Sequence, residues 1–577
     1  MKSQKFYLLI TLLIGLLFVA TQLFIFNGFI VPPGYDPITH SQMIQMIAQD
    51  GWLAHFSGYP KGMHAILAVI FTVFRFPIPQ LLIYATIFLS PLLFWGTYFL
   101  FWEYFQSRQK ALWSVAGAFI FSPAILLLYY FGLYPTIWSL FLLPWALFLS
   151  LRLAGKPNIV SAFGFVSLLV LLFLIHPAGL INYFLYLLLF APQIVRLGWR
   201  KNPRKLVTIT VLTICVLGAI VCLQSGSIVE RIHSLSNIPP DINYDPAGFK
   251  AFLTTVFGLV FGAGLNILPL LLYLLATVFF FIASEKTADL DPQMRACIPL
   301  AKLVPLWAGR AKEDTAEFTP QRFISPLKRQ ESKFFPWLAT TFFIVLFLDS
   351  TAFLFLKPVY ALLFPWAEEP RVLAYAFLAI ASLLGLYGDW LWTNLRTKAT
   401  MIIFVFFSGA YVIGVCPFIL RNMLQRYAPV SQNDQEVFGW IQKNIPQNAI
   451  ILNDNTNRKG KLAYSNRPSD GGAWIPFFTG QKILFPYFGS SEVNPEDRIY
   501  ILENLTNLET DEKLHELLKE KKIAYVFYGS RQYAPYERSL DLESLLSNKS
   551  FQLIFEGKVS LNEKPARLFE IVLDPAK

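Results

Sequence analysis

An aspartate and a histidine near the start of the chain are spaced for proton-transfer chemistry. They stand four residues apart in the segment Gly34-Tyr35-Asp36-Pro37-Ile38-Thr39-His40. Residues at that spacing share one face of a helix, where a carboxylate can act as a general base with an imidazole beside it. Asp followed by Pro is also a common start of a helix, so a purely structural N-cap role for Asp36 stays open.

Three other segments place histidine or a cation at the edge of an apolar stretch. They are Tyr59-Pro60-Lys61-Gly62-Met63-His64, His176-Pro177 and Glu369-Pro370-Arg371. The lysine ammonium and the arginine guanidinium are suited to holding a phosphate, and the histidines are candidates to line a cavity. Structural interpretations also stay open: a histidine hydrogen-bonded within a core, a lysine that snorkels, and an arginine paired with a neighbouring glutamate at the headgroups.

The composition indicates the setting in which these residues act. The chain has 577 residues, of which 55% are hydrophobic and only 15% charged, whereas soluble proteins carry roughly 25% charged residues. This deficit excludes a single water-soluble globule and a disordered chain, and it predicts a polytopic α-helical membrane protein. The net charge of +11 lies mostly in short segments between apolar stretches, as in membrane proteins. No nucleic-acid partner is therefore expected.

About eleven apolar stretches are predicted to be transmembrane helices, each of which needs about 20 residues. They are residues 6–30, 79–104, 110–131, 136–154, 158–175, 178–196, 206–224, 264–283, 336–356, 372–392 and 399–420. The stretch 62–76 is too short to span and is expected to be an interfacial or re-entrant helix. With the N-terminus inside, every basic cluster falls on the cytoplasmic side, as the positive-inside rule requires. The loop 31–78, the tail after about 421 and all six histidines then lie on the outer face.

The polar tail is predicted to be a separate domain. Residues 1–424 form the membrane domain, and residues 425–577 are expected to form an extracytoplasmic α/β domain. Asn433 and Asp434 are expected to cap a helix that runs to about residue 444. The remaining expected elements are strands at Ala449–Leu452, Ala524–Tyr528, Phe551–Phe555 and Arg567–Val572, and a helix at Glu512–Lys521.

This architecture resembles the GT-C superfamily of membrane glycosyltransferases, which includes protein O-mannosyltransferases, aminoarabinose transferases and oligosaccharyltransferases. The resemblance covers nearly the whole chain as architecture and a few places as motifs. Asp36 matches the acidic residue of the family's first outer loop, and Tyr59-Pro60-Lys61-Gly62 resembles its proline motif. Glu369-Pro370-Arg371 resembles the arginine before a late span. Trp474-Ile475-Pro476 with Thr479-Gly480 is similar to a pattern in outer domains of bacterial relatives.

The resemblance implies an enzyme that moves a sugar from a polyprenyl-phosphate donor to a glycan, lipid or protein acceptor on the outer face. Asp36 would be the base of an inverting attack. Arg371, and then Lys61, would hold the donor phosphate, and the cavity-lining candidates are His40, His64, His176, Glu369 and Tyr59. Position 38 is Ile rather than the second acid of an Asp-x-Asp motif, and a Trp-Trp-Asp signature is absent. These departures favour a single-sugar donor.

The sequence also bears on the cofactor, the cellular location and the class of protein. If several histidines converge with Asp36, a divalent metal such as Mg or Mn becomes a candidate, with His40 as a ligand, but no spacing here is a metal signature. Compact loops and the N-terminal lysines favour a multi-pass protein of a prokaryotic plasma membrane. The alternatives are a transporter or flippase, a polymerase or ligase of lipid-linked glycans, and a receptor, for which so many spans are unnecessary.

Overall fold

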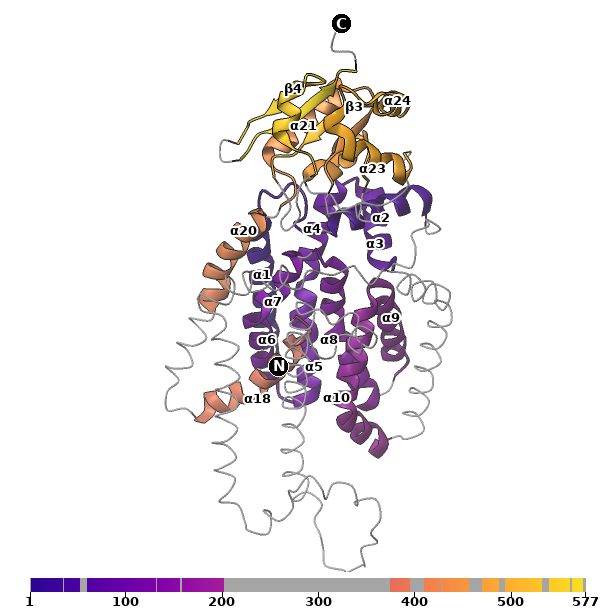
Figure 1. Ribbon diagram of the computed structural model, residues 1–577. Helices are drawn as coiled ribbons and strands as arrows, with labels where there is room; N and C mark the ends of the chain where they lie inside the picture. Colours follow the sequence, from indigo (N-terminus) through magenta and orange to yellow (C-terminus); the bar gives the residue numbers. More distant parts are fainter. Residues whose placement is uncertain are drawn as a thin grey trace, which may run out of the picture.

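The structure contains a helical region and a C-terminal α/β domain stacked on one end of it (Figure 1). It is a computed structural model that describes residues 2–34, 36–51, 60–130, 132–155, 158–201, 374–394, 409–426, 428–455, 470–486, 493–531, 539–560 and 563–573. The described helices of the first region are α1 (Lys2–Phe26), α2 (Pro37–Asp50), α3 (Gly62–Phe74), α4 (Ile78–Leu89), α5 (Pro91–Phe105), α6 (Arg108–Ile120), α7 (Ser122–Tyr130), α8 (Tyr134–Gly155), α9 (Ile159–Ile175), α10 (Pro177–Lys201), α18 (Phe377–Asn394) and, after a π-helical turn at Tyr411–Val415, α20 (Cys416–Arg426).

Several of these helices suit a bilayer. Among the described residues, three helices are long and apolar enough to cross a membrane: Lys5–Phe26, Ile78–Phe105 and Tyr134–Gly155, with mean hydropathies of 2.6, 1.6 and 1.7. Large apolar side chains remain exposed on the helical region, among them Leu13, Phe88 and Phe163, and lipid would cover such surfaces. The chain is therefore a membrane protein.

The three spans coincide with the predicted stretches 6–30, 79–104 and 136–154. Four further predicted spans, 158–175, 178–196, 372–392 and 399–420, overlap with shorter apolar helices at Ile159–Ile175, Ala178–Phe190, Phe377–Gly388 and Val412–Asn422. The predicted spans 206–224, 264–283 and 336–356 lie outside the described residues. The total of eleven therefore stays a prediction.

Proline divides two of the predicted spans. The span Ile78–Phe105 consists of α4 and α5 with a break at Ser90, and the predicted span 110–131 consists of α6 and α7 with a break at Phe121. The proline that follows each break lacks the amide that would continue the helical hydrogen bonding. At the first break, the Ser90 hydroxyl donates to the carbonyl of Ile87 (2.7 Å) and accepts from Nε2 of Gln22 (2.8 Å). The polar groups at this break are thus paired inside the protein.

The short helix expected on the outer side is α3, which has 13 residues. His64 and Leu67 on one side are fully buried, whereas Val69 and Val73 on the other side are 63% and 66% exposed. A short helix with one apolar face turned outward is typical of a membrane interface.

The C-terminal domain, called the outer domain below after the location that the sequence predicts, is built on a mixed five-stranded sheet in the order β2-β1-β3-β5-β4. Its strands are β1 (Ile450–Asn453), β2 (Lys482–Ile483), β3 (Ile523–Tyr528), β4 (Phe551–Gly557) and β5 (Ala566–Ile571). Strand β1 runs parallel to β2 and β3, and β5 runs antiparallel to β3 and β4. The helices are α21 (Gln432–Asn444), α22 (Ile475–Thr479), α23 (Pro495–Asn504), α24 (Glu512–Glu520) and α25 (Leu542–Ser547).

Helices cover both faces of this sheet, because alternate strand residues point to opposite sides. Ile450 and Leu452 of β1 belong to a core with residues of α23 and α24. Ile451, between them, belongs to a second core with residues of α21 and α22. The second core also contains Val31 and Ile38 from the first outer loop, so the outer domain rests directly on the start of α2.

The expected α/β domain is confirmed, with one correction at its first helix. All four predicted strands and the helix at Glu512–Lys521 occur within two residues of the predicted bounds. The N-cap of α21 is Ser431, not Asn433 or Asp434: the Ser431 hydroxyl accepts from the Asp434 amide, and the Asp434 side chain accepts from the Ser431 amide. The strand β2 and the helices α22, α23 and α25 were not predicted from the sequence.

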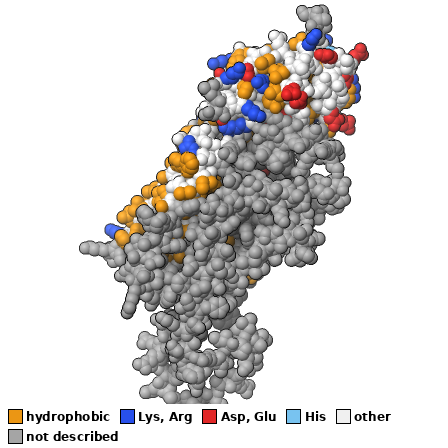
Figure 2. Space-filling view, turned by 60° about the vertical axis from the view of Figure 1, so that its left-hand side comes forward, with side chains coloured by type: hydrophobic (Ala, Val, Ile, Leu, Met, Phe, Trp, Pro, Cys, Tyr) orange, Lys and Arg blue, Asp and Glu red, His pale blue; other side chains and the backbone are white. Residues whose placement is uncertain are grey.

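Two arginines connect neighbouring segments: Arg421 connects α20 to α1, and Arg531 connects the outer domain to α20. Arg421 of α20 donates to the carbonyls of Phe24 (3.2 Å) and Asn27 (3.3 Å) at the end of α1. Arg531 of the outer domain donates to the carbonyls of Gln425 (2.7 Å) and Ala428 (3.2 Å) at the end of α20. Figure 2 shows apolar side chains gathered along α20, below charged side chains on the outer domain. The surface therefore changes from apolar to charged close to the junction between α20 and the outer domain.

Candidate functional site

Four segments of the helical region meet around the start of α2. A Cβ atom added to Gly132, in the turn between α7 and α8, would lie 2.5 Å from Cδ of Pro37. One added to Gly62, at the start of α3, would lie 2.8 Å from the backbone of Leu174, near the end of α9. Gly132 also has a φ of +73°, which favours glycine. The starts of α2 and α3, the α7–α8 turn and the α9–α10 turn thus form one site.

Asp36 stands at the edge of this site. It occupies the N-cap position of α2, but its side chain makes no capping hydrogen bond. Its backbone carbonyl accepts from the amide of His40 (3.0 Å), so the two residues are one helical turn apart, as their spacing predicts. The carboxylate is half-buried. The structural alternative, a side-chain cap, is therefore not the role of this carboxylate.

His40 and His64 form a buried pair. Nδ1 of His40 lies 3.0 Å from Nε2 of His64, and Nδ1 of His64 lies 3.1 Å from the carbonyl oxygen of Pro60. A carbonyl only accepts hydrogen bonds, so His64 carries its proton on Nδ1. Its Nε2 then accepts from the Nδ1 proton of His40. This arrangement requires both imidazoles in defined tautomers.

Burial keeps both imidazoles uncharged. Both side chains are at most 1% exposed. Loss of hydration lowers the pKa of His64 to about 4. The same burial lowers the pKa of His40 well below its usual value, and the neighbouring His64 and His176 lower it further. At neutral pH the pair can orient a polar ligand or pass on a proton, but it cannot act as a cation for phosphate.

His176 and Lys61 complete the described part of the predicted site. His176 is half-buried at the end of α9, where its Nδ1 accepts from the amide of Ala178 (3.2 Å). It is close enough to His40 to influence the pKa of that residue. Lys61 is half-buried at the N-cap position of α3, three residues before His64. Histidines from three segments and one cation therefore converge at this end of the bundle.

Buried hydroxyls near this site were not predicted. Oγ1 of Thr39 on α2 and the OH of Tyr134 and Oγ1 of Thr136 on α8 are buried and have no hydrogen-bond partner among the described residues. Buried polar atoms are normally paired, so these three offer hydrogen bonds to water or to a ligand. The only signals in the sequence are that Thr39 lies within the Asp36 motif and Tyr134 beside an outer turn.

Three predicted site residues, Tyr59, Glu369 and Arg371, lie outside the described residues. Within the described ranges, no three His, Cys, Asp or Glu residues are arranged to hold a metal ion. The nitrogen Nδ1 of His40 is engaged by His64.

The fold and this site define a helical membrane protein with a C-terminal α/β domain, in which the starts of α2 and α3 meet next to that domain. Residues 392–571 match a family described as "Family of unknown function (DUF6541)". The match begins within the last turn of α18 and contains α20 and the whole five-stranded sheet. No curated protein matches the chain. No GT-C family matches it either, so that resemblance depends on the architecture and motifs quoted above.

Proposed function

We propose that this chain is a GT-C-type glycosyltransferase that moves a single sugar from a polyprenyl-phosphate donor to an acceptor on the outer face of a prokaryotic plasma membrane. The observation that carries the proposal is the convergence at α2. The half-buried Asp36 lies one helical turn from a buried histidine pair. This group is formed by the ends of apolar helices, where a lipid-linked donor would present its phosphate.

In the proposed reaction, Asp36 takes the proton from the acceptor hydroxyl as its oxygen attacks the anomeric carbon. The bond between that carbon and the phosphate oxygen breaks on the opposite side, so the configuration inverts. The polyprenyl phosphate leaves with the electron pair. Lys61, together with Arg371, stabilises the charge that grows on the phosphate. The neutral His40 and His64 hold the sugar or the acceptor in place.

Release of polyprenyl phosphate tests this proposal. The purified protein is given a panel of polyprenyl-phosphate sugars, and Asp36→Asn is compared with Asp50→Asn. Asp50 is an exposed aspartate at the far end of the same helix, so it controls for loss of a charge on α2. We expect Asp36→Asn to reduce release by about 10²–10⁴-fold, and Lys61→Ala and Arg371→Ala to weaken it, while Asp50→Asn behaves as wild type.

Correct folding of each variant is checked by circular dichroism and size exclusion. Release from no donor, or release indifferent to Asp36→Asn in a folded protein, would refute the proposal. Addition of a chelator decides the metal question, because a metal-independent transferase keeps its turnover in excess EDTA.

A transporter or flippase of lipid-linked glycans is the second candidate, and the broken helices favour it. Transporters bind substrates where membrane helices are discontinuous. The break between α4 and α5 has such a polar centre, since Ser90 accepts from Gln22, and Gln22 in turn accepts from Tyr129 (2.6 Å). A flippase would move labelled lipid-linked sugar across proteoliposomes without releasing polyprenyl phosphate. Gln22→Leu would then stop the movement, whereas Asp36→Asn would not.

A further inference from the structure

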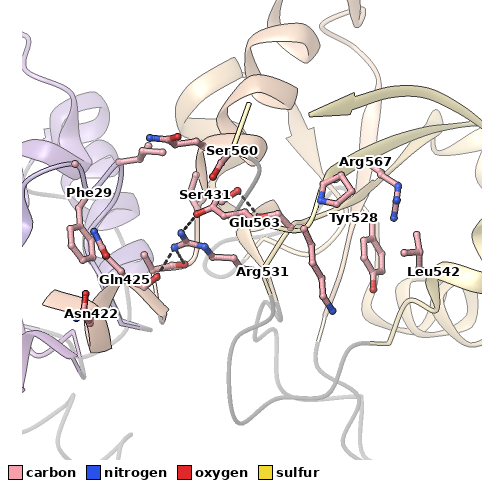
Figure 3. Close-up of a pocket in the computed structure, with 18 residues that line it drawn as sticks. Phe29, Asn422, Gln425, Ser431, Tyr528, Arg531, Leu542, Ser560, Glu563 and Arg567 are labelled. Carbon is pink, nitrogen blue, oxygen red and sulfur yellow. Dashed lines mark hydrogen bonds and ion pairs between the residues drawn. The ribbon is translucent and has the colours of Figure 1, made fainter. Parts of the chain in front are cut away.

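A hollow of about 1000 Å³ lies between the outer domain and the ends of the membrane helices. We propose that it binds an acidic carbohydrate, namely an anionic stretch of the acceptor glycan; this inference rests on the transferase function proposed above. Figure 3 shows Phe29, Asn422 and Gln425 on the side of the helical region, and Tyr528 and Arg567 on the opposite side. A volume of this size is at the upper end of ligand sites in proteins, so it accommodates more than a phosphate or one monosaccharide.

The wall of this hollow has the chemistry of a carbohydrate site. Side-chain amides are contributed by Asn422 and Gln425, and a hydroxyl by Ser560. Amides and hydroxyls both donate and accept hydrogen bonds, as the many hydroxyls of a sugar require. Tyr528, from the sheet side, adds a flat ring with a polar end.

The charges of the wall favour an anion. The lining side chains include three cations, Arg531, Lys564 and Arg567, and one carboxylate, Glu563. Glu563 is already paired with Arg531, which leaves the other two cations in excess over acid groups of the wall. Arg567 also pairs with Glu556 at 3.1 Å, whereas Lys564 is exposed. Lys564 is therefore the best single probe of the positive charge.

The position of the hollow links it to the proposed chemistry. Its wall includes Gly28, Phe29 and Ile30, and Ile30 precedes Asp36 by six residues. Six residues span at most about 22 Å even when fully extended. A polymeric acceptor held in the hollow could therefore span the distance to Asp36. A free monosaccharide bound there would gain nothing from this arrangement.

Equilibrium binding to the full-length protein tests the inference. The protein is placed in nanodiscs of neutral phosphatidylcholine, and calorimetry compares trigalacturonate with maltotriose, a neutral sugar of equal length. We expect trigalacturonate to bind at least tenfold more tightly at low salt, with the advantage shrinking as salt rises. Lys564→Gln should reduce the affinity for trigalacturonate about tenfold, as the loss of one charge-assisted hydrogen bond would. Lys519→Gln, on exposed α24 and away from the hollow, should leave it unchanged.

Three results would overturn the inference. They are equal or absent binding of the two sugars, an affinity that Lys564→Gln does not change, and displacement of trigalacturonate by nanodiscs that contain phosphatidylglycerol. The last result would assign the hollow to a lipid headgroup. No donor is present in this experiment, so its outcome is independent of turnover. Selective binding without sugar transfer would refute only the transferase, whereas transfer to neutral acceptors without selective binding would refute only the acidic-glycan site.

Discussion

The buried His40–His64 pair makes the stability of the helical region depend on pH, and His64 sets the size of the effect. An unfolded histidine titrates near pH 6.5, whereas burial lowers the pKa of His64 to about 4 in the folded protein. The folded state therefore excludes a proton that the unfolded state binds. The stabilisation is complete above pH 6.5 and is lost progressively as the pH falls toward 4. A difference of about 2.5 pKa units corresponds to about 3 kcal/mol.

Two substitutions separate this titration from the loss of the hydrogen bond. His64→Gln removes the titrating group and keeps an acceptor in reach of Nδ1 of His40. His64→Leu removes both, and it leaves the buried His40 donor unpaired at an additional cost of about 1–3 kcal/mol. Wild type should lose up to about 3 kcal/mol more stability than His64→Gln between pH 6.5 and 4. The variant His64→Leu should be less stable than His64→Gln at every pH.

Unfolding by sodium dodecyl sulfate in mixed micelles measures these differences. The helical signal in circular dichroism is followed at a series of pH values for wild type and both variants. Carboxylates titrate in the same range, so the quantity of interest is the difference between wild type and His64→Gln at each pH. Identical pH profiles for the two proteins would refute the reasoning, because His64 would then titrate alike in the folded and unfolded states.

Three further predictions concern positions that hold the site and the outer domain. Gly132→Ala should lower donor turnover and the thermal stability, because an alanine is strained at φ +73° and its Cβ would lie 2.5 Å from Pro37; Gly155→Ala, where nothing lies within 4 Å, is the matched control. Arg531→Met should lower the free energy of unfolding of the outer domain by about 3 kcal/mol, as the loss of one partner of a mostly buried ion pair does. Hydrogen exchange at the end of α20 should rise accordingly, and unchanged exchange would contradict the role given to Arg531. Ser431→Ala should lower the free energy of unfolding by about 1 kcal/mol, as measured by thermal unfolding, because the capping box of α21 is lost.

The outer domain was predictable from sequence to the extent that its elements carry a local signal. Strand β1 was found because the run Ala449–Leu452 is apolar and lies between Asn448 and Asn453, and both faces of the strand prove to be covered by helices. The strand β2 has two residues and no periodicity to detect. The cap of α21 was misplaced because Ser431, Asn433 and Asp434 are all good capping residues, and only the backbone geometry selects among them.

The site was predictable in its residue types but not in its contacts. The sequence indicated His40 and His64 separately, from their places beside apolar stretches. Their hydrogen bond joins residues 24 positions apart and exists only because α2 and α3 pack together. Beyond the places of Thr39 in the Asp36 motif and of Tyr134 beside a turn, nothing in the sequence indicates that their hydroxyls are buried and unpaired among the described residues, since an exposed threonine or tyrosine has the same sequence pattern. Hydrophobic periodicity identifies single helices and strands, whereas a site depends on how several of them pack together.

In the proposed transferase, the outer domain would have a second role beyond holding an acceptor. Val31 and Ile38, on either side of Asp36, are buried in the core that contains Trp474 and Ile475 of the outer domain. Burial of such side chains contributes about 1.5–3 kcal/mol each, so the loop that carries the proposed base depends on the domain above it. A displacement of the outer domain would therefore also move Asp36. If a bound acceptor favours one position of the domain, binding of the acceptor and alignment of the base become a single event, and the base is in place only when there is a hydroxyl for it to deprotonate.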